Sequence, residues 1–192
     1  MLLNDGSGAF SLSKNIPSFK DNGSCVTAGD FDGDGDQDLF VGTRVIPGRF
    51  PEVPSSRILE NKDGVFKEVV FDDATKIGLI NDAQWVDLDG DKKDELIIAG
   101  DWMSLKVLSF SGGKFVDQSS KYGLAKYSGF WQKLKLADVD GDGDMDVVAG
   151  NFGLNTRYKA SQKEPLTCYG GCLLYTSPSP RDQRGSRMPS SA

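Results

Sequence analysis

Acidic residues are concentrated in three short segments of the chain. Of the 28 Asp and Glu residues, fifteen lie within residues 30–38, 87–95 and 138–146. Each segment carries acidic side chains at its first, third, fifth and ninth positions, and a Gly at its fourth. Like charges at this density repel one another strongly unless a cation lies among them. The spacing therefore predicts three metal-binding loops.

The three predicted loops offer oxygen ligands only, and most of these are carboxylates. This ligand set favours Ca²⁺ over Mg²⁺ and over transition metals, so up to three structural Ca²⁺ ions are expected. The seventh position is expected to bind through its backbone carbonyl, which leaves its side chain free to vary. The expected ligands are Asp30, Asp32, Asp34, Asp36 and Asp38 in the first loop, Asp87, Asp89, Asp91, Lys93 and Glu95 in the second, and Asp138, Asp140, Asp142, Asp144 and Asp146 in the third.

An EF-hand and a polar turn without an ion are the two alternatives to a metal-binding loop of this kind. An EF-hand shares the opening Asp-x-Asp-x-Asp-Gly, but it needs a bidentate Glu at the twelfth position and flanking helices. Here the twelfth residue is Val41, Ile98 or Ala149, inside an apolar run typical of a strand, which excludes the EF-hand. The other alternative is a polar turn without an ion. It is strongest for the second loop, where Lys92 and Lys93 would repel a cation.

The loops belong to an internal repeat. Their first aspartates lie 57 and 51 residues apart. A second marker, a glycine-containing turn that ends in Phe10, Phe66 or Phe115, precedes each loop by 20 to 23 residues. A period of about 50 residues with several short strands per unit is typical of a β-propeller blade. The sequence therefore predicts an all-β chain built from blades of four antiparallel strands.

The strands of one unit can be placed from its apolar pattern. Within the first unit we expect strands over residues 24–28, 39–41, 57–60 and 65–69, with a hairpin turn at Asp63-Gly64 between the last two. No amphipathic helix of ten residues separates the strands, which argues against a βαβ arrangement. Residues 72–81 are expected to form one helical turn at most.

These motifs resemble the FG-GAP/VCBS repeat family, whose blades carry Asp-x-Asp-Gly-Asp-Gly-x-x-Asp followed by an apolar strand and Gly. That family includes the integrin α-subunit propeller. Segments such as AGDWMSLKVL and GNFGLNTRYKASQKEPL resemble bacterial members found with an ASPIC/UnbV domain. The resemblance covers residues 2–171 and implies a seven-bladed ring with Ca²⁺ in its strand-connecting loops. Three units cannot close such a ring, so an open arc of about three blades is expected.

The composition of the chain changes at Cys172. Residues 1–171 carry the repeats and form the predicted partial propeller, whereas residues 172–192 are rich in Ser, Pro and Arg. The second segment, CLLYTSPSPRDQRGSRMPSSA, resembles a translated sequencing adapter with its flanking primer. We therefore expect a non-native disordered tail and a natural protein that continues past Gly171. Met1 is not followed by a secretory signal and is expected to lie inside that longer protein.

Charge and residue types limit the classes of function. The net charge of −6 argues against nucleic acid as a partner, and no apolar run is long enough for membrane insertion. The chain has no His, and its clustered carboxylates are assigned to ions, so a non-enzymatic role is expected. The predicted function is a calcium-stabilised binding, adhesion or scaffold module that is extracellular, periplasmic or on the outer cell surface. The alternative is the non-catalytic propeller portion of a larger secreted carbohydrate-active hydrolase or lyase.

The partner is expected to be a protein or a carbohydrate at the cell surface. Propellers usually contact ligands through loops at one face. Trp and Arg are good anchors for such contacts. The candidate contact residues are Arg44, Arg49, Trp102, Trp131, Asn155 and Arg157.

Overall fold

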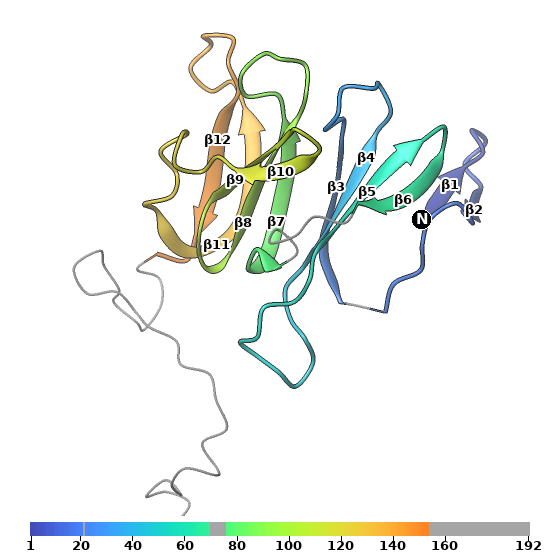
Figure 1. The fold of residues 1–192 in the computed structure, drawn as a ribbon, viewed down its shortest axis with the longest axis horizontal. Helices are drawn as coiled ribbons and strands as arrows, with labels where there is room; N and C mark the ends of the chain where they lie inside the picture. The colour runs from blue at the N-terminus through green and yellow to red at the C-terminus, as the bar shows by residue number, and fades with distance from the viewer. Residues whose placement is uncertain (21, 70–75, 154–192) are drawn as a thin grey trace, which may run out of the picture.

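The computed structural model describes residues 1–20, 22–69 and 76–153 (Figure 1). Within these ranges the chain forms twelve β-strands, and every strand pair is antiparallel. The predicted all-β class is confirmed. The proposed adapter-derived tail over residues 172–192 lies outside the described residues and stays a prediction, as do the contacts proposed for Asn155 and Arg157.

The first complete unit is a four-stranded sheet in which neighbours in sequence are neighbours in space. It contains β3 (Gly23–Gly29), β4 (Asp38–Thr43), β5 (Arg57–Lys62) and β6 (Val65–Val69), in the order β3-β4-β5-β6. All four predicted strands are present. The hairpin turn between β5 and β6 falls at Asp63-Gly64, where both residues have positive φ, as a tight hairpin requires.

The second and third units share one hydrogen-bonded sheet, which four-stranded blades alone do not predict. The second unit contains β7 (Leu79–Val86), β8 (Glu95–Ser104), β9 (Lys106–Ser111) and β10 (Lys114–Asp117). The third contains β11 (Ser128–Ala137) and β12 (Asp146–Asn151).

The long strand β8 is what joins these two units. Residues 95–101 of β8 pair with β7 and residues 96–98 pair with β9, whereas its last residues extend beyond β9 and pair with the start of β11. The register between β8 and β11 shifts at Trp102, whose φ of 61° marks a bulge. Strand β7 begins at Leu79, so residues 79–81 of the segment 72–81 are extended, and residues 72–75 of that segment lie outside the described residues.

The middle unit is covered on both faces by its neighbours. On β8, Leu96 and Ile98 belong to a core cluster shared with Phe40 and Ile58 of the first sheet. The alternate residues Ile97 and Ala99 belong to a second cluster with residues of β9 and β11. A strand buried on both faces has a continuous run of apolar residues, as in the LIIA segment of β8. This stacking of sheets face to face is the arrangement of propeller blades.

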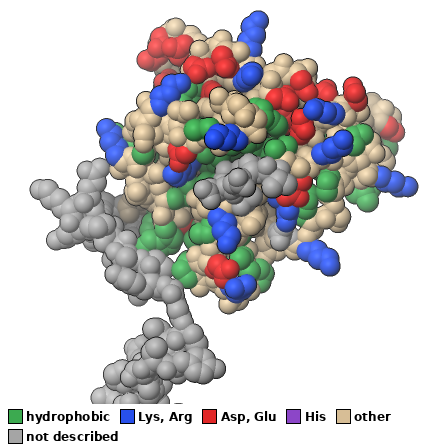
Figure 2. All heavy atoms as spheres, viewed as in Figure 1, with side chains coloured by type: hydrophobic (Ala, Val, Ile, Leu, Met, Phe, Trp, Pro, Cys, Tyr) green, Lys and Arg blue, Asp and Glu red, His purple; other side chains and the backbone are tan. Residues whose placement is uncertain are grey.

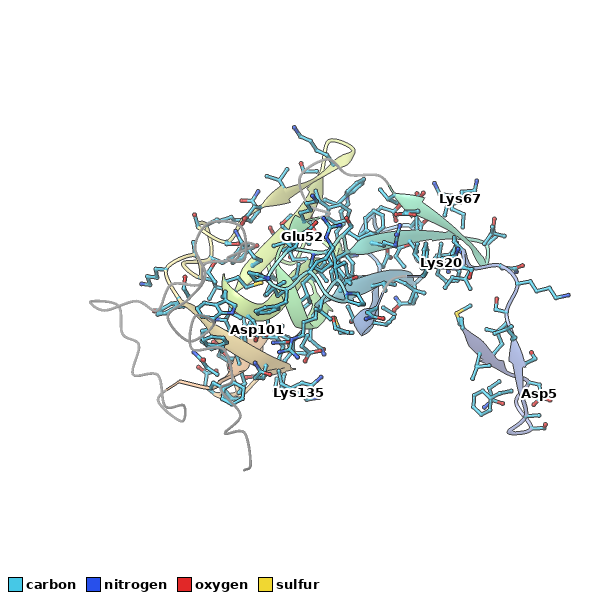
Figure 3. All side chains as sticks on the ribbon, turned by 90° about the horizontal axis from the view of Figure 1, so that it is seen from below. Asp5, Lys20, Glu52, Lys67, Asp101 and Lys135 are labelled. Atoms are coloured by element: carbon cyan, nitrogen blue, oxygen red, sulfur yellow. The ribbon has the colours of Figure 1, made fainter. Side chains whose placement is uncertain are left out.

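The first hairpin corresponds in register to the last two strands of the first sheet. Strands β1 (Leu2–Asn4) and β2 (Phe10–Leu12) pair with each other and with no other described strand. By hairpin register, Leu2 and Phe10 correspond to Leu59 and Phe66 of the first sheet. Both are 64% exposed, whereas Leu59 and Phe66 are buried. Figure 3 shows this hairpin, with Asp5 near its turn, set apart from the sheets.

A buried carboxylate ties the three units together at the end of the strands farthest from the acidic loops. Asp101 of β8 accepts hydrogen bonds from Arg44 at 2.7 and 3.0 Å, from Asn81 of β7 at 2.8 Å and from Gln132 of β11 at 3.0 Å (Figure 3). Asp101 is only 5% exposed. Such a charge is stable in the interior only while its hydrogen bonds are made.

We expect Arg44→Ala to lower the free energy of unfolding by about 1–3 kcal/mol, because it removes the charged partner of a buried carboxylate. Arg49 provides the matched control, since its ion pair with Glu52 is exposed on both sides. Arg49→Ala is expected to change stability by less than about 0.5 kcal/mol. Urea unfolding of the two variants checks this, and equal effects would contradict the assignment of Asp101 as a link between units.

Candidate metal centre

The three acidic loops project from the same end of the sheets. They connect β3 to β4, β7 to β8 and β11 to β12, and Figure 1 shows all three at the upper ends of these strands. Figure 2, in the same view, shows acidic side chains gathered along this upper edge. The repeat therefore places each loop at the equivalent point of successive units.

In every loop the carboxylates at the first, third and ninth positions converge. One oxygen from each of the three residues lies within 4.8 Å of the other two. The groups are Asp30, Asp32 and Asp38; Asp87, Asp89 and Glu95; and Asp138, Asp140 and Asp146. Three converging carboxylates repel one another and offer a hard cation several oxygens at once, so the donor set fits a divalent ion.

The backbone of each loop wraps the carboxylate at the first position. In the first loop the N–H of Gly33 donates to Oδ1 of Asp30 at 2.8 Å, and that of Gly35 donates to Oδ2 at 2.9 Å. The equivalent pairs of bonds reach Asp87 and Asp138. The Gly at the fourth position has a φ of 77–80° in all three loops, a conformation that a side chain disfavours.

The ninth position is held in the same way throughout. The N–H at the second position donates to its carboxylate, from Phe31 to Asp38 at 3.2 Å, from Leu88 to Glu95 at 2.8 Å and from Val139 to Asp146 at 2.9 Å. Three loops from separate parts of the chain thus adopt one hydrogen-bond pattern.

The fifth and seventh positions lie outside the converging groups. The carboxylates of Asp34, Asp91 and Asp142 instead accept the N–H of the seventh residue, each at 2.9 Å. The roles predicted for these residues and for Asp36, Lys93 and Asp144 therefore stay predictions.

The second loop departs from the others in two ways. Lys92 takes a φ of 70°, where the first and third loops have Gly, and this conformation costs a non-glycine residue about 1 kcal/mol. The ammonium of Lys121 also lies 3.3 Å from Oδ2 of Asp89, which is one of the three converging carboxylates of this loop. Both features weaken this loop as a cation site.

Burial raises the pKa of the most buried candidate ligand of the first loop. Asp38 is 0% exposed, and loss of hydration raises its pKa to about 6, against the hydrogen bonds donated by Asn61 and Phe31. Burial also raises the pKa of Glu95, the equivalent residue of the second loop. A bound cation would favour the charged form of both.

In chelator, we expect the free energy of unfolding of the Asp38→Asn variant, relative to that of the wild-type chain, to increase as the pH rises from 4.5 to 7. The pKa of Asp38 is higher in the folded chain than in the unfolded one, so its contribution to stability is lost as the pH rises through about 6. The neutral Asn variant escapes this loss, which amounts to about 1–2 kcal/mol over that interval. Urea unfolding at the two pH values measures it. A difference between variant and wild type that does not change with pH would contradict the assignment.

Antiparallel units stacked face to face, each with an acidic loop between its first two strands, define a repeat protein of the β-propeller class. The family model described as FG-GAP-like repeat matches residues 1–41 and 87–149, more than half of the chain, and the chain belongs to that family. No curated protein sequence matches the chain significantly. In the part of the chain that the structure describes, no helix has the length and apolar character needed to cross a bilayer.

Proposed function

We propose that this chain is part of an extracellular β-propeller whose acidic loops bind structural Ca²⁺ and whose role is to bind a partner or serve as a scaffold. The observation that carries the proposal is the convergence of three carboxylates at equivalent positions of three repeat units. FG-GAP repeats are typical of extracellular proteins, where calcium is plentiful. Extracellular modules bind it with dissociation constants of about 0.1–1 mM.

In this proposal calcium has a structural role, in which it stabilises strand pairs, and takes no part in catalysis. Each loop joins the first two strands of its unit, so a cation that neutralises its carboxylates fixes the register of those strands. The residues that hold the ion are those of the converging groups, with the fifth and seventh positions completing the oxygen set. The family is generally a non-catalytic repeat, which supports a scaffold role.

Isothermal titration calorimetry of the full chain with calcium and with magnesium tests this proposal. We expect calcium to bind with a dissociation constant of about 0.1–1 mM and magnesium to bind more weakly. A variant with Asp32→Ala, Asp89→Ala and Asp140→Ala, one change in each group, is the control and is expected to give no heat of binding. A folded wild-type chain without calcium heat would overturn the calcium assignment.

The partner is proposed to bind at the strand ends opposite the acidic loops. Strand β8 runs from Glu95, a loop ligand, to this end, where Trp102 is 36% exposed, has a φ of 61° and packs edge-on against Phe130. Strained backbone at an exposed aromatic residue supports a binding role. A glycan array probed with the labelled chain tests for a carbohydrate. Binding lost in Trp102→Ala and kept in Val139→Ala, a change at an exposed apolar residue of the third acidic loop, supports this face, and equal binding by the two variants contradicts it.

A further inference from the structure

The first and second loops touch each other, and the contact involves an expected ligand of the first loop. The N–H of Asp30 donates to Oδ2 of Asp94 at 2.9 Å, and the N–H of Asp94 donates to the carbonyl of Asp30 at 2.9 Å. Asp30 is the first ligand of its loop. Asp94 is the eighth residue of the next loop, between Lys93 and Glu95. Two hydrogen bonds therefore join the two candidate sites directly.

The close approach needed for this contact is built into the strands. Gly29 precedes Asp30, and a Cβ added there would lie 2.3 Å from Cβ of Trp85 and 2.8 Å from Oδ2 of Asp94. Only Gly leaves room for the neighbouring unit at this distance. The stem of Lys93 also covers the first loop, because a Cβ on Gly33 would lie 3.4 Å from its Cγ. Residues of the second loop thus pack directly against the first loop.

The third loop has no counterpart of Asp94 that could make this contact with the second loop. The eighth position is Gln37 in the first loop and Met145 in the third, and a Met side chain cannot accept a strong hydrogen bond from a backbone N–H. The ligands of the third group are also more exposed than those of the first, since Asp138 and Asp140 are exposed and Asp30 and Asp32 are half-buried. The contact is specific to the first pair of loops.

We propose that Asp94 is a positioning residue that couples calcium binding in the first loop to calcium binding in the second. The inference rests on the proposed function. Ordering of residues 93–95 around an ion in the second loop fixes the Asp94 carboxylate, which then holds the backbone of Asp30 in place for the first loop. Coupling between sites is reciprocal, so each loop strengthens the other.

Calorimetry of the full chain with the third loop silenced by Asp140→Ala tests the coupling. We expect two calcium ions to bind in this background. Silencing the second loop as well, by Asp89→Ala, is expected to weaken binding in the first loop by about 5- to 10-fold. In a chain that also carries Asp94→Ala, silencing the second loop is expected to change the affinity of the first by less than about 2-fold.

Two further variants separate this contact from a general loss of structure. Asp94→Asn keeps an oxygen that accepts the N–H of Asp30, so it is expected to retain the coupling. Gln37→Ala changes the same position of the first loop and is expected to leave the coupling intact. Far-UV circular dichroism of each variant reports folding independently.

The outcomes distinguish the two proposals. Failure of the wild-type chain to bind any calcium overturns both the proposed function and the coupling. Calcium binding with an unchanged first-loop affinity when the second loop is silenced overturns the coupling alone. Retention of full coupling in Asp94→Ala, or a single bound ion in the Asp140→Ala background, also overturns the coupling and leaves the calcium assignment of the first loop standing.

Discussion

Addition of about 10 mM calcium to the metal-free chain is expected to raise its free energy of unfolding by about 2 kcal/mol for each loop that binds an ion. The figure follows from mass action with a dissociation constant of a few tenths of a millimolar. The first and third loops are expected to contribute fully. The second contributes less, because Lys121 pairs with Asp89 and Lys92 carries a positive φ.

Urea unfolding in calcium, in magnesium and in chelator measures this effect. The variant with Asp32→Ala, Asp89→Ala and Asp140→Ala serves as its control and is expected to unfold at the same urea concentration in all three buffers. In chelator this variant is expected to be at least as stable as the wild-type chain, since it relieves repulsion among the converging carboxylates. Equal stability of the wild-type chain in calcium and chelator would contradict the account.

Replacement of Phe31 by Ala is expected to lower the free energy of unfolding by about 3–5 kcal/mol. Phe31 is the second residue of the first loop and is 1% exposed. Its ring lies 4.8 Å from that of Phe110, 5.1 Å from that of Phe115 and 6.2 Å from that of Trp85, all in the next unit. A residue of the acidic loop thereby anchors one unit in the core of its neighbour.

Val139 is the matched control for Phe31. It occupies the second position of the third loop and is 65% exposed. Val139→Ala is expected to change stability by less than about 0.5 kcal/mol. Thermal or urea unfolding of the two variants in the same buffer compares them, and a loss of less than about 1 kcal/mol for Phe31→Ala would show that the units do not depend on this contact.

Local features of the sequence were sufficient to place the four strands of the first unit. Strand β6 begins and ends at the predicted residues, and the hairpin turns at Asp63-Gly64 as expected. These elements are specified by neighbours in the chain, namely an apolar run and residues that tolerate positive φ. The convergence of the first, third and ninth carboxylates follows equally from one short loop.

Contacts between units could not be predicted from the same patterns. The pairing of β8 with β11 depends on a bulge at Trp102, and bulges leave no periodic signal. The residue at the second position of each loop is apolar, namely Phe31, Leu88 or Val139. Phe31 is nevertheless buried and Val139 exposed, because among the described residues only the first loop faces a complete neighbouring unit. The bond between Asp30 and Asp94 joins residues 64 apart and emerges only when the units stack.

Terbium luminescence excited through tryptophan tests whether the first two loops bind calcium. Trp85 precedes Asp87 by two residues and packs against Phe31 of the first loop, so its indole is placed to sensitise an ion in either loop. We expect sensitised emission that calcium displaces, that an equal concentration of magnesium leaves unchanged, and that Trp85→Phe abolishes. A folded chain that gives no sensitised emission, or emission that calcium does not displace, would contradict calcium binding by the first two loops.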